Sequence, residues 1–155
     1  MTEFIRKSWQ ALTTDEVYQL LRLRSAVFVV EQNCAYQDMD GLDQLAEHLF
    51  CTDDQQHLTG YARLLPPGSE GGSHCSIGRV VVDPSKRQQQ LGRQLMQTAL
   101  AHCDQLWPHV PVLISAQTYL TRFYQALGFV NTGDYYLEDM IPHQKMIHQK
   151  NQPAE

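Results

Sequence analysis

The sequence lacks several features that would point to particular classes of protein. Its 155 residues carry a formal net charge of −5, whereas a protein that binds nucleic acid usually presents a basic stripe to the phosphate backbone. No run of eighteen apolar residues occurs, and the N-terminal MTEFIRKSW lacks the apolar centre of a secretion signal. We therefore expect neither nucleic acid nor a membrane as a partner, and we expect a cytoplasmic protein.

Cysteine is scarce, and its spacing excludes the common metal and redox motifs. The four cysteines are far apart and none belongs to a Cys-x-x-Cys pair: they are Cys34, Cys51, Cys75 and Cys103. Thiols with this spacing in a cytoplasmic protein are ordinarily reduced and buried. We expect neither a metal site nor a disulfide.

What is present suits one ordinary domain, since 43% of the residues are hydrophobic. We expect a single domain over residues 1–149 and a frayed tail at 150–155. Apolar periodicity and turn residues predict strands at 4–9, 47–53, 57–66, 75–83 and 111–116, two more strands within 129–149, and helices at 13–32, 91–107 and 119–127. This order predicts a mixed α/β fold with helices covering a central sheet, and 75–83 and 111–116 as buried strands.

The turn after the valine-rich strand is the first candidate for a binding site. Pro84 ends the strand and Leu91 begins the apolar stripe of the next helix. The backbone amides from about Arg87 to Arg93 therefore lie at a helix N-terminus, where N–H groups lack internal partners and attract an anion such as phosphate. An ordinary strand-to-helix turn with solvated basic residues has the same pattern.

The stretch VVVDPSKRQQQLGRQLMQTAL resembles the acyl-CoA-binding segment of the GNAT superfamily of N-acetyltransferases, whose pattern is Arg/Gln-x-x-Gly-x-Gly/Ala. Arg87 and Gly92 match the outer positions, and Gln90 replaces the first glycine. If the Gln90 backbone is helical, its N–H can still donate while its side chain points away. The resemblance implies acetyl-CoA as co-substrate, with its pyrophosphate and pantetheine arm held by Val80, Val81, Val82, Arg87, Gln88, Gln90, Leu91, Gly92 and Arg93.

A second motif lies further along the chain. Phe123, Tyr124, Gly128 and Phe129 reproduce the Phe-Tyr-x-x-x-Gly-Phe setting that is common in GNAT domains. The resemblance implies that Tyr124 protonates the departing CoA thiolate, and a phenol with a pKa of about 10 is protonated at neutral pH. It also implies that Gln117 places an amide against the coenzyme. The alternative is that Tyr124 is a half-buried structural aromatic residue.

The first half of the chain extends the resemblance to nearly the whole sequence. LRLRSAVFVVEQNCAYQDMDGLD, GYARLLP, IGRVVV and IPHQKM together are similar to the ElaA-like branch of GNAT proteins. This implies a GNAT-like α/β fold with a mixed, mostly antiparallel sheet of about seven strands flanked by helices. It also implies direct transfer of an acetyl group from acetyl-CoA to the amine of a small molecule or peptide, and by analogy a possible homodimer.

The sequence leaves the general base open. An amine must lose a proton before it attacks a thioester, so a carboxylate, an imidazole or a water is needed nearby. The strand before the turn offers no Asp or Glu. The candidates for the base or for acceptor binding are Glu31, Asp38, Asp40 and Asp43 on one side, and Glu138, Asp139 and His143 on the other.

One pattern supports a rival interpretation. Arg24, Phe28, Asp38, Asp40, Asp43 and Arg63 are similar in spacing to the acidic and basic set of acyl-homoserine-lactone synthases. Those enzymes share the GNAT-like fold and acylate the amine of S-adenosylmethionine. A further alternative is a domain that binds acyl-CoA without catalysis.

Overall fold

The computed structural model describes residues 2–148, without the side chains of Gln88 and Gln89. Seven strands form one sheet in the order β1-β2-β3-β4-β5-β7-β6, in which only β4 and β5 are parallel neighbours. The strands are β1 (Ile5–Ser8), β2 (Glu47–Thr52), β3 (Leu58–Leu65), β4 (Cys75–Val82), β5 (Val112–Gln117), β6 (Val130–Glu138) and β7 (Ile141–His148). The expected mixed, mostly antiparallel sheet is confirmed, whereas the predicted tail at 150–155 lies outside the described residues.

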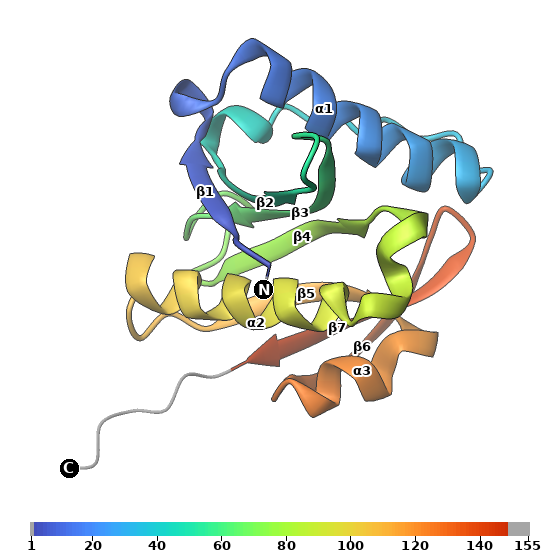
Figure 1. Ribbon diagram of the computed structural model, residues 1–155. Coiled ribbons are helices and arrows are strands. Elements are labelled where there is room, and N and C mark those ends of the chain that lie inside the picture. The colour runs from blue at the N-terminus through green and yellow to red at the C-terminus, as the bar shows by residue number, and fades with distance from the viewer. Residues whose placement is uncertain (1, 149–155) are drawn as a thin grey trace.

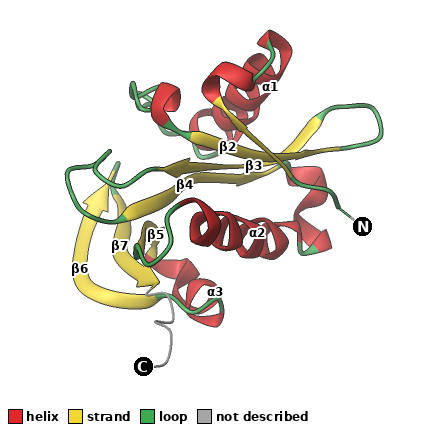
Figure 2. Cartoon of the chain, turned by 90° about the vertical axis from the view of Figure 1, so that its left-hand side faces the viewer, coloured by secondary structure: helices red, strands yellow, loops and turns green. Residues whose placement is uncertain are grey.

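Three helices flank the sheet on its two faces (Figure 1). They are α1 (Thr14–Arg24), α2 (Leu91–Leu106) and α3 (Thr121–Ala126). Figure 2 shows α1 on one side of the sheet and both α2 and α3 on the other. No helix in the described part of the chain is long and apolar enough to cross a membrane.

The helix α1 begins where the sequence predicts. The Thr13 hydroxyl accepts a hydrogen bond from the Glu16 amide, and the Glu16 carboxylate accepts one from the Thr13 amide, which is a capping box. The predicted helix continues beyond Arg24 as a π-helical segment, η2 (Ser25–Glu31), so its end near Glu31 is confirmed but its last turns are wider than α-helical.

Two apolar clusters hold the helices to the sheet. Leu20, Leu23 and Val27 pack with Val81 of β4 on one face, whereas Leu95, Met96 and Ala99 of α2 pack on the other face. Val80 and Val82 contact this second cluster. β4 is therefore packed on both faces, as its run of valines predicts.

The strand β5 departs from expectation. Val112, Ile114 and Ala116 are buried under the α2 face, but Ser115 between them is exposed. The prediction that 111–116 is a buried strand is therefore wrong for one of its two faces. That face looks away from α2, and it is part of the candidate site.

Candidate functional site

A wedge in the sheet between β4 and β5 forms a cleft. β4 and β5 pair only at Cys75–Val112 and Ser76–Leu113, and then the two strands separate. A cleft of about 780 Å³ lies between the C-terminal halves of the two strands, and its lining includes Val80, Val81 and Val82 of β4 and Gln117 of β5. The edge of β4 that faces this gap presents main-chain N–H and C=O groups beyond the two paired residues.

An irregularity in β4 sets the shape of this wedge. Tyr61 pairs with Val81 and Arg63 with Gly78, so Arg79 and Val80 lie opposite the single residue Ala62. This is a β-bulge, and Arg79 occupies the left-handed region at φ 51°. Arg79 is held there by ion pairs to Asp38 and Asp40 at 2.8 and 3.3 Å.

The start of α2 lies beside the far end of β4. The turn η4 (Pro84–Gln89) leads to Gln90, and the first helical hydrogen bond runs from the Gln94 amide to the Gln90 carbonyl. The amides before Gln94 lie ahead of this ladder, where α-helical geometry supplies no acceptor. A side chain at Gly92 would meet only Val82 Cγ2, at 3.8 Å, so there is open space above the helix N-terminus.

The side chains of this turn do not all reach the cleft. Arg87 lines it, but Leu91 is buried in the core and Arg93 is exposed. Gln90 has φ 56° and ψ 22°, so its backbone is left-handed and not the helical conformation in which its N–H was expected to donate; the donation itself stays a prediction. The predicted contacts of Leu91, Gly92 and Arg93 therefore stay predictions for their main chain, and the side chain of Gln88 lies outside the described residues.

At the mouth of the cleft, Arg87 forms an ion pair with one of the predicted acceptor residues. Its two terminal nitrogens donate to the Glu31 carboxylate at 2.5 and 2.9 Å. This hydrogen bonding lowers the pKa of Glu31. Glu31 is therefore a weak base, and it lies at the end of the cleft where Arg87 and the turn before α2 are.

Tyr124 and Gln117 both line the cleft. Tyr124 extends from α3, between the edges of Phe123 and Phe129, with ring centroids 5.1 and 5.8 Å away. Burial, together with the nearby Tyr119, raises the pKa of Tyr124 to about 12. Its phenol is therefore protonated throughout the neutral range.

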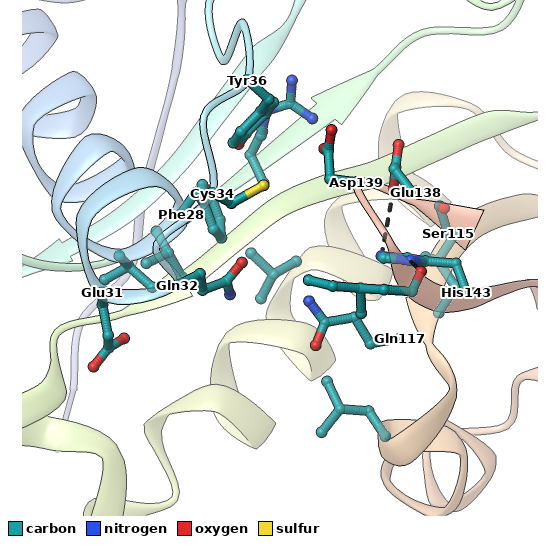
Figure 3. A pocket seen from close by; sticks show the side chains of 18 of the residues that line it. Phe28, Glu31, Gln32, Cys34, Tyr36, Ser115, Gln117, Glu138, Asp139 and His143 are labelled. Atoms are coloured by element: carbon teal, nitrogen blue, oxygen red, sulfur yellow. Dashed lines mark hydrogen bonds and ion pairs between the residues drawn. The ribbon is translucent and has the colours of Figure 1, made fainter.

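The opposite end of the cleft carries an imidazole beside a carboxylate. Figure 3 shows Ser115, Glu138 and His143 close together, with Asp139 nearby and Glu31 far from them. His143 Nδ1 lies 2.7 Å from the Ile141 carbonyl, which can only accept, so Nδ1 carries the proton. The lone pair of the neutral ring is then on Nε2, which lies 3.4 Å from Glu138 Oε2.

Asp40 and its neighbours form ion pairs with arginines of the same chain, and the role of Asp40 in acceptor binding or as the base stays a prediction. Three arginines and three aspartates form a network at the packing between α1, the 33–46 segment, β3 and β4; they are Arg24, Arg63, Arg79, Asp38, Asp40 and Asp43. Arg24 is fully buried and Asp40 is not among the residues that line the cleft. The charged residues that suggested a homoserine-lactone synthase are thus engaged with one another, whereas Phe28 of that set lines the cleft.

Three residues that line the cleft were not predicted from the sequence: Ser115, Cys34 and Tyr36. Burial, and then the Asp139 carboxylate, raise the pKa of the Cys34 thiol. No local sequence signal marks these residues, because strands and loops far apart in the chain bring them together. Among the described residues, no group of three or more His, Cys, Asp or Glu side chains is arranged to hold a metal ion.

Comparison with known proteins agrees with this geometry. A family profile described as "Acetyltransferase (GNAT) domain" matches residues 11–150. The ElaA protein of Escherichia coli (strain K12) is 42% identical over 140 residues, which cover 85% of this chain and 86% of that protein. Its crystal structure matches with a TM-score of 0.89 at 39% identity, over 96% of this chain and all of that one.

An acyl-CoA N-acyltransferase from Pseudomonas aeruginosa matches with a TM-score of 0.88 at 44% identity, over 94% of this chain and 99% of that chain. The shared fold implies an acyl-CoA co-substrate and an acceptor. This chain therefore belongs to the GNAT acetyltransferase family, in its ElaA-like branch, and is an acyltransferase.

Proposed function

We propose that the protein transfers an acetyl group from acetyl-CoA to an amine, by direct attack in a ternary complex. The observation that carries this proposal is the wedge between β4 and β5, whose open main-chain edge leads to the N-terminus of α2. An extended arm with amide groups can pair with such an edge as an added strand would. A diphosphate at its end would meet the first amides of α2, for which α-helical geometry supplies no acceptor, and the Arg87 guanidinium.

His143 is the base that this geometry favours. An acceptor ammonium gives one proton to His143 Nε2, and the neutral nitrogen then attacks the acetyl carbon. A main-chain N–H of Val80–Val82 polarises the carbonyl oxygen. The C–N bond forms as the C–S bond breaks, and the second proton of the nitrogen passes to the sulfur, giving an amide and CoA thiol.

Tyr124 acts on the departing sulfur. Because an ordinary thiol has a pKa of about 8.5, full proton transfer from a phenol with a pKa of about 12 is uphill. A hydrogen bond donated to the developing thiolate stabilises it without that transfer. The raised pKa of Cys34 keeps this cysteine a thiol, which supports direct attack over a covalent acyl-enzyme.

Calorimetry with CoA tests the donor site. We expect measurable binding to the protein and loss of that binding in Gly92→Trp, because the indole would fill the space above the α2 amides. Gly92→Ala is the matched control, since its Cβ meets only an ordinary contact at 3.8 Å and should leave CoA binding near that of the wild type. Absence of binding at millimolar CoA in the wild-type protein would sink the proposal.

Thiol release from acetyl-CoA with a panel of amines tests Tyr124. We expect Tyr124→Phe to lower kcat by about 10²-fold, to a similar extent from neutral to mildly alkaline pH, because the hydroxyl keeps its proton there. Tyr18→Phe, on the exposed surface of α1, is the control. Unchanged turnover in Tyr124→Phe would favour a structural role for the ring, and CoA binding without turnover would favour a non-catalytic domain.

A further inference from the structure

On the face of the sheet that looks away from α2 and α3, the part formed by the C-terminal strands β5, β6 and β7 is open. Val112, Ile114 and Ala116 pack in the α2 core, so alternation along β5 directs Leu113, Ser115 and Gln117 to the opposite face. Figure 2 shows that α1 lies over β2, β3 and β4 on that side, while β6 and β7 curve away from it. The open part of this face therefore begins at the border of the area that α1 covers.

A hollow of about 560 Å³ follows this face, and we call it the acceptor groove. It is lined by Arg63, Leu65, Glu70, His74, Ser76, Ile77, Gly78, Arg79, Leu113, Ile114, Ser115, Asp134, Tyr136, Glu138 and Lys145. Six of these residues also line the cleft: Ile77, Gly78, Arg79, Ile114, Ser115 and Glu138. The groove is thus continuous with the acceptor end of the cleft, beside His143.

Carboxylates dominate the charge of the acceptor groove. Glu70, Asp134 and Glu138 all lie close enough to Tyr136 that, after burial, their charges help to raise the pKa of its phenol to about 12. Lys145, 3.8 Å from Asp134, is the one lysine of the lining.

The two arginines of the groove do not offset these carboxylates. Arg63 pairs with Asp40 and Asp43, and Arg79 pairs with Asp38 and Asp40. Since Arg24 completes this network with equal numbers of positive and negative groups, the network is neutral as a whole. The groove is left with an excess of negative charge that a cation would relieve.

One hydroxyl of the groove is open to a ligand. Ser76 is 8% exposed and alternates with Cys75 and Ile77, whose side chains belong to the α2 core, so its own side chain points into the groove. Within the part of the chain that the structure describes, its hydroxyl forms no hydrogen bond to the protein, and its oxygen is not among the atoms sealed from solvent without a partner. A hydroxyl oxygen has two acceptor lone pairs, so a ligand N–H in the groove can donate to it.

We propose that the acceptor groove binds a linear aliphatic amine with two or more positive charges. Its reacting nitrogen lies beside Ser115 and His143, and a further ammonium group lies near Glu70 and Asp134. This inference rests on the proposed function, whose acceptor it specifies. The volume of the groove, about 560 Å³, suits a small molecule.

Calorimetry with CoA present tests the inference without depending on turnover. The probes are a linear aliphatic triamine and an alkyl monoamine with the same number of chain atoms. We expect the triamine to bind at least about tenfold more tightly, and this preference to shrink as salt is added, because exposed charges are screened. When thiol release from acetyl-CoA is measured with the same two amines, the triamine should have the lower KM.

The paired variant Glu70→Gln, Asp134→Asn should lose most of this preference. Both side chains are about half exposed, so the variant is expected to fold, and thermal unfolding checks this. Asp54→Asn, an exposed site in the β2–β3 turn, removes a negative charge outside the groove and is the matched control.

Equal binding of the two amines, or a preference that survives in the paired variant, would overturn the inference. CoA binding in separate titrations reports on the proposed function. If CoA fails to bind while the triamine preference persists in the protein alone, the donor assignment fails and the groove stands. If CoA binds and the preference is absent, the groove assignment fails and the transferase stands.

Discussion

At the scale of single residues, Gln90 has a backbone conformation that is unfavourable for a residue with a side chain. Its φ of 56° is in the left-handed region, which costs a residue with a Cβ about 1 kcal/mol or more relative to glycine. Glycine gives back part of this through its more flexible unfolded state. We therefore expect Gln90→Gly to stabilise the protein by about 0.5–1 kcal/mol and to tighten CoA binding, as measured by urea unfolding and calorimetry.

Gln90→Ala is the matched control for that change, because alanine keeps the backbone strain and removes only the exposed amide side chain. Its stability should stay close to that of the wild type. A Gln90→Gly protein that is less stable than both would mean that the glutamine side chain makes a contribution larger than the strain.

Glu31 is the second residue whose position decides its function. Because its carboxylate accepts from both terminal nitrogens of Arg87, a phosphate that binds there has to compete with it for the guanidinium. We expect Glu31→Gln to bind CoA several-fold more tightly, since the amide neither competes for the guanidinium nor repels the diphosphate. Calorimetry measures the gain, and acetyl-pantetheine, which lacks the diphosphate, should bind both proteins equally; an equal gain for both ligands would contradict the prediction.

At the scale of elements, the order of strands and helices follows from local patterns. The start of α1 near Thr13, the apolar stripe of α2 and the valines of β4 agree with the prediction, because every one of these signals lies within a single element. Gly128 directly follows the helix predicted at 119–127; it has φ 99°, which is common just beyond a helix end, and a Cβ there would lie 2.8 Å from His148 Nε2.

The features that shape the site could not be predicted from local sequence patterns. The segment Ser25–Glu31 has the apolar spacing of an α-helix, and its π-helical widening depends on packing against the sheet. The left-handed position of the bulge is taken by Arg79 and not by the neighbouring Gly78, and ion pairs to Asp38 and Asp40 hold its backbone there. The motifs predicted the donor half of the cleft, whereas the acceptor half arises where β5, β6 and β7 meet.

At the scale of the whole molecule, the acidic 33–46 segment adds ion pairs between α1, β3 and β4 to their apolar packing. Asp38 accepts from Arg24 on α1 and from Arg79 on β4, and Asp43 accepts from Arg24 and from Arg63 on β3. The aspartates that the sequence offered as ammonium ligands therefore bind guanidinium groups of the same chain. Breaking one such buried pair leaves its partner charged and unpaired, which is costly.

This network predicts how stability depends on pH. Burial alone would raise the pKa of Asp40, but hydrogen bonds from Arg63 and the charges of Arg63 and Arg79 hold it at about 2. In the unfolded chain the pKa of an aspartate is about 3.9, so between these values the unfolded state binds more protons than the folded state. The contribution of Asp40 is complete above about pH 4 and is lost as the pH falls through about 2, with a size of about 1–2 kcal/mol after allowance for solvent screening.

Urea unfolding at a series of pH values from about 6 down to about 2 measures this contribution against Asp40→Asn. The variant should be less stable at neutral pH, because its amide cannot replace the charge that faces Arg63 and Arg79. As the pH falls, the wild-type carboxylate becomes protonated and resembles the amide, so the free energies of unfolding of the two proteins should converge. Curves that stay parallel down to the lowest pH would show that Asp40 is not held by the arginines, and the bulge at Arg79 would then need another support.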